Sequence, residues 1–226
     1  MKGVFKLRPI KPRYNLTWDP SIVLNYLAQK WPNEDLNLET LTKKTVTLLA
    51  LVTAHRMQTL SFIKISNISI RNSRQIIIKI PDLIKTSRPN CTQPVLVLPY
   101  FNERPEICPA RSLEAYLNKT QYIRNKNDYL FISFKRPHSK VSPQTLGKWI
   151  KQVLCCSGID TSIFTAHSTR HAATSSANKL GVSIDIIRKT AGWTNSSCVF
   201  AKYYNKEIVS DSNEFAIRVL SVNNNL

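Results

Sequence analysis

The stretch TAHSTRH, at positions 165–171, decides how the rest of this 226-residue sequence is interpreted. It opens a predicted helix over residues 165–180, which Gly181 ends because glycine is favoured just beyond the last helical turn. His167 and Arg170 stand three residues apart, so their side chains share one face of that helix. An arginine can hold a phosphate through two parallel hydrogen bonds, and a neighbouring histidine can donate or carry a proton. Taken alone the His-x-x-Arg pair is common, so by itself it does not indicate a catalytic site.

Two further features follow this helix. A short helix is predicted over residues 183–191, ended by Gly192, and Trp193 comes directly after that glycine. The aromatic run FAKYY then occupies positions 200–204. A glycine–tryptophan pair followed by tyrosines supports a catalytic interpretation of the His-x-x-Arg pair, which the pair alone does not.

Upstream of position 55, two helices are predicted. Asp19 followed by Pro20 is typical of a helix start, because aspartate caps the first turn and proline fits its first position. This helix runs through Leu27. The second helix spans residues 38–54, and its apolar side is formed by Leu41, Leu48, Leu49 and Val52.

The pattern changes between these helices and the motif. Three short segments rich in β-branched residues are separated by polar turns, which is typical of a small antiparallel sheet: residues 63–70, 75–80 and 94–98. Helices return after Pro109, including one that Ser142-Pro143 starts and Gly158 ends, and a last pair around residues 197–204 and 213–220. The order predicts an α+β fold, a mostly helical domain with a three-stranded antiparallel sheet.

The composition narrows the class of protein. Lysine and arginine number 32 against 14 aspartate and glutamate, a net charge of +18, which favours a polyanionic partner. A generically basic protein is the alternative. No apolar run is long enough to span a membrane or serve as a secretory signal, so we expect a soluble, intracellular protein. The five cysteines form no CxxC pair, which disfavours a zinc site and a disulfide scaffold.

The order His-x-x-Arg, Gly-Trp and then a tyrosine about ten residues on resembles the signature of the tyrosine recombinase (phage integrase) family. The text HSTRHAATSSANKLGVSIDIIRKTAGWTNSSCVFAKYYNKEI is most similar to recombinases of eukaryotic mobile elements of the DIRS and Crypton kinds, and the resemblance covers roughly residues 10–210. It implies a basic N-terminal arm or linker at 1–18, a catalytic domain at 19–210, and a C-terminal tail or helix at 211–226. That tail is expected to dock either on a neighbouring subunit or on its own domain.

The resemblance also implies site residues upstream. The text LVTAHRMQTLSFIKISNI places the family's first arginine at Arg56, just before the sheet. A lysine is expected in the turn between the second and third strands, where we choose Lys85, with Lys79 and Arg88 as alternatives. Trp193 takes a position where many bacterial members carry histidine.

The nucleophile is one of two adjacent tyrosines. Bacterial spacing favours Tyr203, whereas the mobile-element pattern, with Phe200 four residues earlier and Asn205-Lys206 following, favours Tyr204, which we choose. The catalytic set that the resemblance implies is therefore Arg56, Lys85, His167, Arg170, Trp193 and Tyr204.

The implied activity is cleavage and rejoining of DNA through a 3′-phosphotyrosyl intermediate, for integration or excision of a mobile element, with no metal and no cofactor. The implied partners are double-stranded DNA and further copies in a homodimer or homotetramer, with no membrane. The helical core-binding domain of relatives is expected from the full-length protein, and the nucleus is the expected location. The alternatives are an inactive domesticated DNA-binding protein, a type IB topoisomerase and a generic RNA- or chromatin-binding protein.

Basic residues outside the catalytic set are expected to bind backbone phosphates, which would make binding steeply salt-dependent. A solvated charged surface is the simpler explanation for some of them. They are Lys43, Lys44, Arg71, Arg74, Lys135, Arg136, Lys148 and Lys151.

Overall fold

The computed structural model describes residues 14–71, 74–84, 87, 93–194 and 204–208, and within these ranges α3 (Leu38–Thr53) is the central helix. It is buried on nearly all sides, threonines included. The hydroxyls of Thr42, Thr47 and Thr53 donate to carbonyl oxygens one turn earlier, at 2.6–2.7 Å, so their burial leaves no hydroxyl unpaired. Val52 is 38% exposed, which corrects its predicted place on the apolar side.

Four further helices surround α3 or lie beside it: α2 (Pro20–Ala28), α4 (Met57–Ser61), α5 (Pro109–Thr120) and α6 (Pro143–Cys156). Their starts follow from local chemistry. Asp19 accepts a hydrogen bond from the backbone N–H of Ser21, and the Ser142 hydroxyl accepts one from Thr145. The predicted starts of α2 and α6 are confirmed.

The three-stranded sheet is antiparallel, with the order β2 (Ile68–Arg71), β3 (Gln75–Lys79) and β4 (Val95–Pro99). Ile76 pairs with Leu98 and Ile78 with Leu96, and these four side chains are buried. The first strand is shorter than predicted, because residues Ile65–Asn67 form a 3-10 turn. The predicted α+β fold with a small antiparallel sheet is confirmed.

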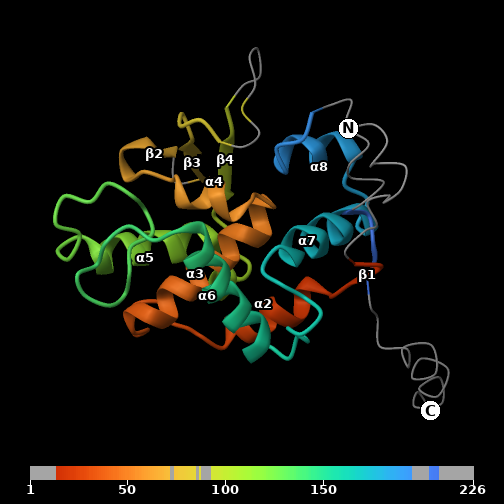
Figure 1. The fold of residues 1–226 in the computed structure, drawn as a ribbon, viewed down its shortest axis with the longest axis horizontal. Helices are drawn as coiled ribbons and strands as arrows, with labels where there is room; N and C mark the ends of the chain where they lie inside the picture. The colour runs from red at the N-terminus through yellow and green to blue at the C-terminus, as the bar shows by residue number, and fades with distance from the viewer. Residues whose placement is uncertain (1–13, 72–73, 85–86, 88–92, 195–203, 209–226) are drawn as a thin grey trace, which may run out of the picture.

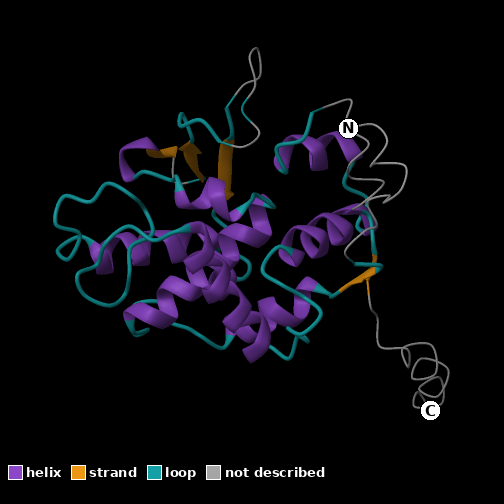
Figure 2. Ribbon diagram, in the orientation of Figure 1, coloured by secondary structure: helices purple, strands orange, loops and turns teal. Residues whose placement is uncertain are grey.

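The C-terminal part of the described chain consists of α7 (Ser168–Lys179), α8 (Ile184–Thr190) and β5 (Glu207–Ile208). β5 pairs in parallel with β1 (Leu16–Thr17), so the two ends of the described chain lie side by side. Figure 1 shows the three-stranded sheet at the upper left and α7 and α8 at the right, with α3 in the middle. Figure 2 shows that the strands form two small groups in a body made mostly of helices.

Residues 14–18, which the sequence placed in a loose basic arm, pack against the domain. Tyr14 and Trp18 are 4% and 3% exposed, and the Trp18 indole N–H donates to the Ser168 hydroxyl at 2.8 Å. The predicted helices around 197–204 and 213–220 lie outside the described residues, apart from Tyr204. None of the helices in the described ranges has both the length and the apolar character needed to cross a bilayer.

Candidate active site

The His-x-x-Arg pair lies at the start of α7. The helix begins at Ser168, three residues later than predicted, and His167 occupies the N-cap position with helical backbone angles. The backbone N–H of Arg170 donates to the carbonyl of His167 at 3.2 Å. This turn keeps the two residues on one face of the helix, as the spacing predicts.

Tyr204 lies against this face. Its hydroxyl oxygen is 2.9 Å from Nε2 of His167, within hydrogen-bonding distance. Its ring stacks on the imidazole of His171, with centroids 4.2 Å apart and planes 15° apart, and the ring of Trp193 packs on it at 4.8 Å. Only 8% of Tyr204 is exposed. With Ile187 it forms a small apolar cluster between α7 and α8.

Arg170 is fully buried beside this tyrosine. Its Nη2 donates to the backbone carbonyl of Ala191 at 3.2 Å, and its guanidinium carbon lies 5.1 Å and 5.5 Å from the ring centroids of Trp193 and Tyr204. Within the described residues, Nε and Nη1 have no hydrogen-bond partner. Burial, and then the charge of Arg56, lowers the pKa of Arg170 to about 10. The Tyr204 hydroxyl opposes this lowering. A buried cation with few partners among the described residues is a strong candidate to bind an anion.

Arg56 stands on the corner between α3 and α4. The corner forms because Ala54 adopts a left-handed conformation, with φ of 49°, after which Arg56 is extended and precedes the first turn of α4. Arg56 is half-buried, and its charge acts on both Arg170 and His55. The corner and the start of α7 therefore bring two arginines from distant parts of the sequence into one electrostatic neighbourhood.

His55 is a buried neighbour of these arginines that the sequence did not single out. Burial lowers its pKa to about 3, the charges of Arg170 and Arg56 act in the same direction, and a hydrogen bond to the backbone of Thr190 opposes them. A Cβ atom at Gly192 would lie 3.0 Å from Cε1 of this imidazole. Glycine therefore lets the end of α8 approach the corner closely.

The structure brings together five of the six predicted site residues: Arg56, His167, Arg170, Trp193 and Tyr204. Lys85 and its alternative Arg88 lie outside the described residues, as does Tyr203. The other alternative, Lys79, is exposed on β3. His171 and Ser175 also contact Tyr204, and their positions four and eight residues after His167 on one helix were a signal that could have identified them.

The prediction that Lys44 binds backbone phosphates is wrong. Lys44 is 1% exposed, and its ammonium donates to the backbone carbonyl of Lys30, so it cannot reach DNA. Lys43 pairs with Glu39. The side chain of Arg71 is not described, and the other basic residues of the set are exposed: Arg74, Lys135, Arg136, Lys148 and Lys151.

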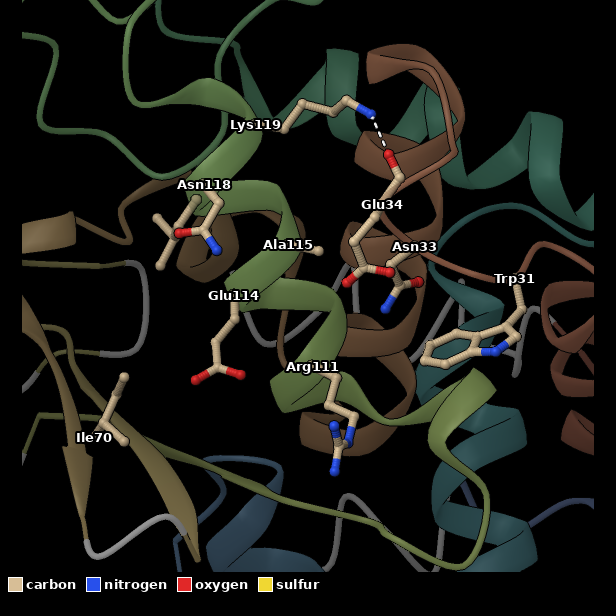
Figure 3. Close-up of a pocket in the computed structure, with 10 residues that line it drawn as sticks. Trp31, Asn33, Glu34, Ile70, Arg111, Glu114, Ala115, Asn118 and Lys119 are labelled. Atoms are coloured by element: carbon tan, nitrogen blue, oxygen red, sulfur yellow. Dashed lines mark hydrogen bonds between the residues drawn. The ribbon is translucent and has the colours of Figure 1, made fainter.

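A separate cavity lies on α5 and the segment before α3, away from the tyrosine. Its lining includes Arg111, Glu114 and Lys119 of α5, and Figure 3 shows the Lys119 side chain reaching the backbone carbonyl of Glu34. None of the residues that line it belongs to the cluster around Tyr204. Its charges are mixed, so it does not resemble an anion-binding site.

The cluster around Tyr204 combines a phenol, an imidazole in contact with it and two cations. Such a set can bind a phosphate-like anion, transfer the phenolic proton and stabilise negative charge that develops on the anion.

Comparisons with known proteins agree on the class. The Phage integrase family profile matches residues 27–208. The fold is similar to XerH site-specific recombinase bound to difH substrate, with a TM-score of 0.63 and 15% identity over 92% of this chain and 53% of that chain. It is similar to XerA recombinase, with a TM-score of 0.59 and 21% identity over 91% of this chain and 63% of that chain.

A lambda integrase dimer bound to a COC′ core site also has a similar fold, with a TM-score of 0.53 and 17% identity over 88% of this chain and 50% of that chain. At these identities the likeness concerns the fold alone. The chain spans between half and two thirds of the length of these three structures. No curated protein sequence matches it.

Proposed function

This chain belongs to the phage integrase (tyrosine recombinase) family, and we propose that it is a site-specific DNA recombinase that cleaves and rejoins strands through a 3′-phosphotyrosyl intermediate. The observation that carries the proposal is the contact of Tyr204 with His167 beside the buried guanidinium of Arg170. A nucleophile, a proton-transfer group and an anion-binding group stand within reach of one phosphate.

In the proposed reaction, the hydroxyl oxygen of Tyr204 attacks the scissile phosphorus. A bond forms between that oxygen and phosphorus, and the bond from phosphorus to the 5′ oxygen of the next nucleotide breaks. His167 accepts the phenolic proton, and Lys85 supplies a proton to the departing 5′ oxygen. Attack by the 5′-hydroxyl of another strand reverses each change, so one phosphodiester replaces another and no ATP is consumed.

The two arginines supply the positive charge that stabilises the phosphate in the transition state. Negative charge grows on the non-bridging oxygens of the phosphate in the transition state, and guanidinium groups of Arg56 and Arg170 stabilise it there. Nε and Nη1 of Arg170, which have no hydrogen-bond partner among the described residues, support this role. Trp193, which packs on Tyr204, is proposed to add a neutral N–H donor.

The substrate proposed is double-stranded DNA at the ends of a mobile element of the DIRS or Crypton kind, integrated or excised in the nucleus. We include in the proposal a homodimer or homotetramer on DNA and a core-binding domain in the full-length protein. The excess of 32 basic over 14 acidic residues supports a DNA partner. The similar lambda integrase structures include a dimer on a core site and a tetramer on a Holliday junction.

Trapping of a covalent adduct tests this function. The full chain is incubated with a pool of nicked duplexes whose bases around the nick are randomised, with the nick placed so that the released short strand diffuses away. Wild type and Tyr203→Phe should give a protein–DNA band that survives denaturing detergent. Tyr204→Phe should give none.

Three results would overturn parts of the proposal. A band lost in Tyr203→Phe and kept in Tyr204→Phe moves the nucleophile by one residue. Binding of the duplexes by wild type without any band identifies an inactive DNA-binding protein. Relaxation of supercoiled plasmids of unrelated sequence, with no strand exchange, identifies a topoisomerase of type IB.

A further inference from the structure

One face of α7, from its N-cap residue His167 to Ser175, contacts Tyr204. His167, His171 and Ser175 are spaced four residues apart, so their side chains form one row along the helix. Each member of the row contacts a different part of the tyrosine. His167 lies at the hydroxyl, His171 at the ring and Ser175 at the backbone.

At the backbone, the hydroxyl of Ser175 acts both as a hydrogen-bond donor and as an acceptor. The hydroxyl of Ser175 donates to the carbonyl of Tyr204 at 2.7 Å and accepts from the backbone N–H of Lys206 at 2.9 Å. Ser175 is 2% exposed, so water does not compete for these bonds. Because one hydroxyl joins groups on both sides of Asn205, it fixes the chain path immediately after the tyrosine.

The contact at the ring fixes the remaining freedom of the side chain. A tyrosine side chain turns about two torsions, and the stack on His171, at 4.2 Å and 15°, favours one ring plane. His171 is itself held edge-on by Tyr14, at 5.1 Å and 83°. α7 is anchored where Trp18 bonds to Ser168.

We propose that His171 and Ser175 are positioning residues for the nucleophile, His171 through the plane of the Tyr204 ring and Ser175 through the backbone that follows it. The proposal rests on the proposed function, in which Tyr204 attacks DNA. Neither residue needs to touch the phosphate. Misplacement of a nucleophile by about 1 Å can slow a reaction by about a hundredfold, so both contacts should affect rate more than DNA affinity.

The test measures three quantities for each variant: the rate of adduct formation at saturating nicked-duplex pool, the dissociation constant for the same DNA, and the unfolding temperature. Ser175→Ala should lower the rate by about tenfold and change the dissociation constant less than about twofold. Ser176→Ala is the matched control, because the next residue of a helix is turned by about 100° from that face. It should react like wild type.

His171 is tested with two variants. His171→Phe keeps a flat ring for stacking, whereas His171→Ala removes it. The alanine variant should lose about thirtyfold in rate, and the phenylalanine variant should retain at least about a third of the wild-type rate. Equal losses in both would overturn a positioning role for His171 and point to its ring nitrogens instead.

A wild-type rate in Ser175→Ala would overturn the role of Ser175, as would a fall in rate that is matched by an equal loss of DNA affinity. If Ser175→Ala fails to fold, Ser175→Cys nearly preserves the side-chain volume but weakens both hydrogen bonds, and should show the same slowing. Tyr204→Phe separates the two proposals. An adduct that persists in Tyr204→Phe overturns the assignment of Tyr204 as the nucleophile, and with it this inference. Loss of the adduct in Tyr204→Phe together with a normal rate in Ser175→Ala overturns this inference alone.

Discussion

The hydroxyl of Tyr204 lies 2.9 Å from Nε2 of His167, although the two residues are 37 positions apart in sequence. Helices α7 and α8 lie between them in sequence. At the end of α8, the carbonyl of Ala191 accepts a hydrogen bond from Nη2 of Arg170. The same short region therefore positions the phenol, its partner imidazole and the buried guanidinium.

Replacing Arg170 by methionine should separate stability from activity. Burial first, and then the charge of Arg56, lowers the pKa of Arg170 to about 10. A base with a lower pKa in the folded state destabilises that state at every pH below its folded pKa, here by roughly 3 kcal/mol. Arg170→Met should keep or raise the unfolding temperature near neutral pH and abolish the covalent adduct. A clearly lower unfolding temperature would contradict this expectation.

His55 should make the protein sensitive to acid. Its folded pKa, lowered to about 3 mainly by burial, lies below the unfolded value of 6.5. The unfolded state therefore takes up the proton first, so stability is full above pH 6.5 and falls as the pH drops toward 3. At about pH 5, protonation of His55 in the unfolded state lowers the free energy of unfolding by roughly 2 kcal/mol relative to neutral pH. Urea midpoints near pH 7.5 and pH 5 should differ less in His55→Gln than in wild type, and equal differences would assign the sensitivity to other groups.

Gly192→Ala should be more harmful than Gly181→Ala. Both glycines have positive φ, of 67° and 86°, so alanine is strained at either position by about 1 kcal/mol. Only at Gly192 would the new Cβ press on His55, at 3.0 Å, since nothing lies within 4 Å of a Cβ at Gly181. Gly192→Ala should therefore lower the free energy of unfolding by about 1–2 kcal/mol more, measured in urea, and also slow adduct formation. Equal costs would show that His55 moves aside freely.

The bond from Trp18 to Ser168 should contribute measurably to stability. Ser168→Ala leaves the buried indole N–H of Trp18 without its 2.8 Å acceptor, which should cost about 1–3 kcal/mol. Trp18→Phe removes the donor, so adding Ser168→Ala to it should cost less than in wild type. A double-mutant cycle in urea measures the coupling, which should be about 1 kcal/mol. Strict additivity would mean that Trp18 contributes packing but that its hydrogen bond to Ser168 adds no stability.

The sequence predicted best what depends on neighbouring residues. The starts of α2 and α6 follow from Asp19-Pro20 and Ser142-Pro143, because a cap and a proline act within one turn. The shared face of His167 and Arg170 follows from helical spacing in the same way. The predicted start of α7 lies three residues before the observed one, because nothing in Thr165 distinguishes an irregular turn from a helical one.

What the sequence missed depends on contacts between distant segments. Lys44 was expected at the surface because it is charged, but the carbonyl of Lys30 gives its ammonium a buried partner. The pairing of β1 with β5 involves two residues on each side, too few for any periodic pattern. The burial of His55 beside two cations follows only from the left-handed turn at Ala54, which no residue type there required.

The pairing of β1 with β5 also affects the order in which parts of the domain can fold during synthesis. During synthesis on a ribosome, β1 emerges first among the described elements and β5 last, with residues 16 and 207 as partners. Helices such as α3 and α5 can fold against each other while the chain is still growing, because domains assemble from the N-terminal side. β5 is the last of the described elements to emerge, so the contacts that hold Tyr204 form after those of the described helices. A nascent chain that stops short of β5 therefore contains Arg56 and Arg170 before Tyr204, the proposed nucleophile, is held in position.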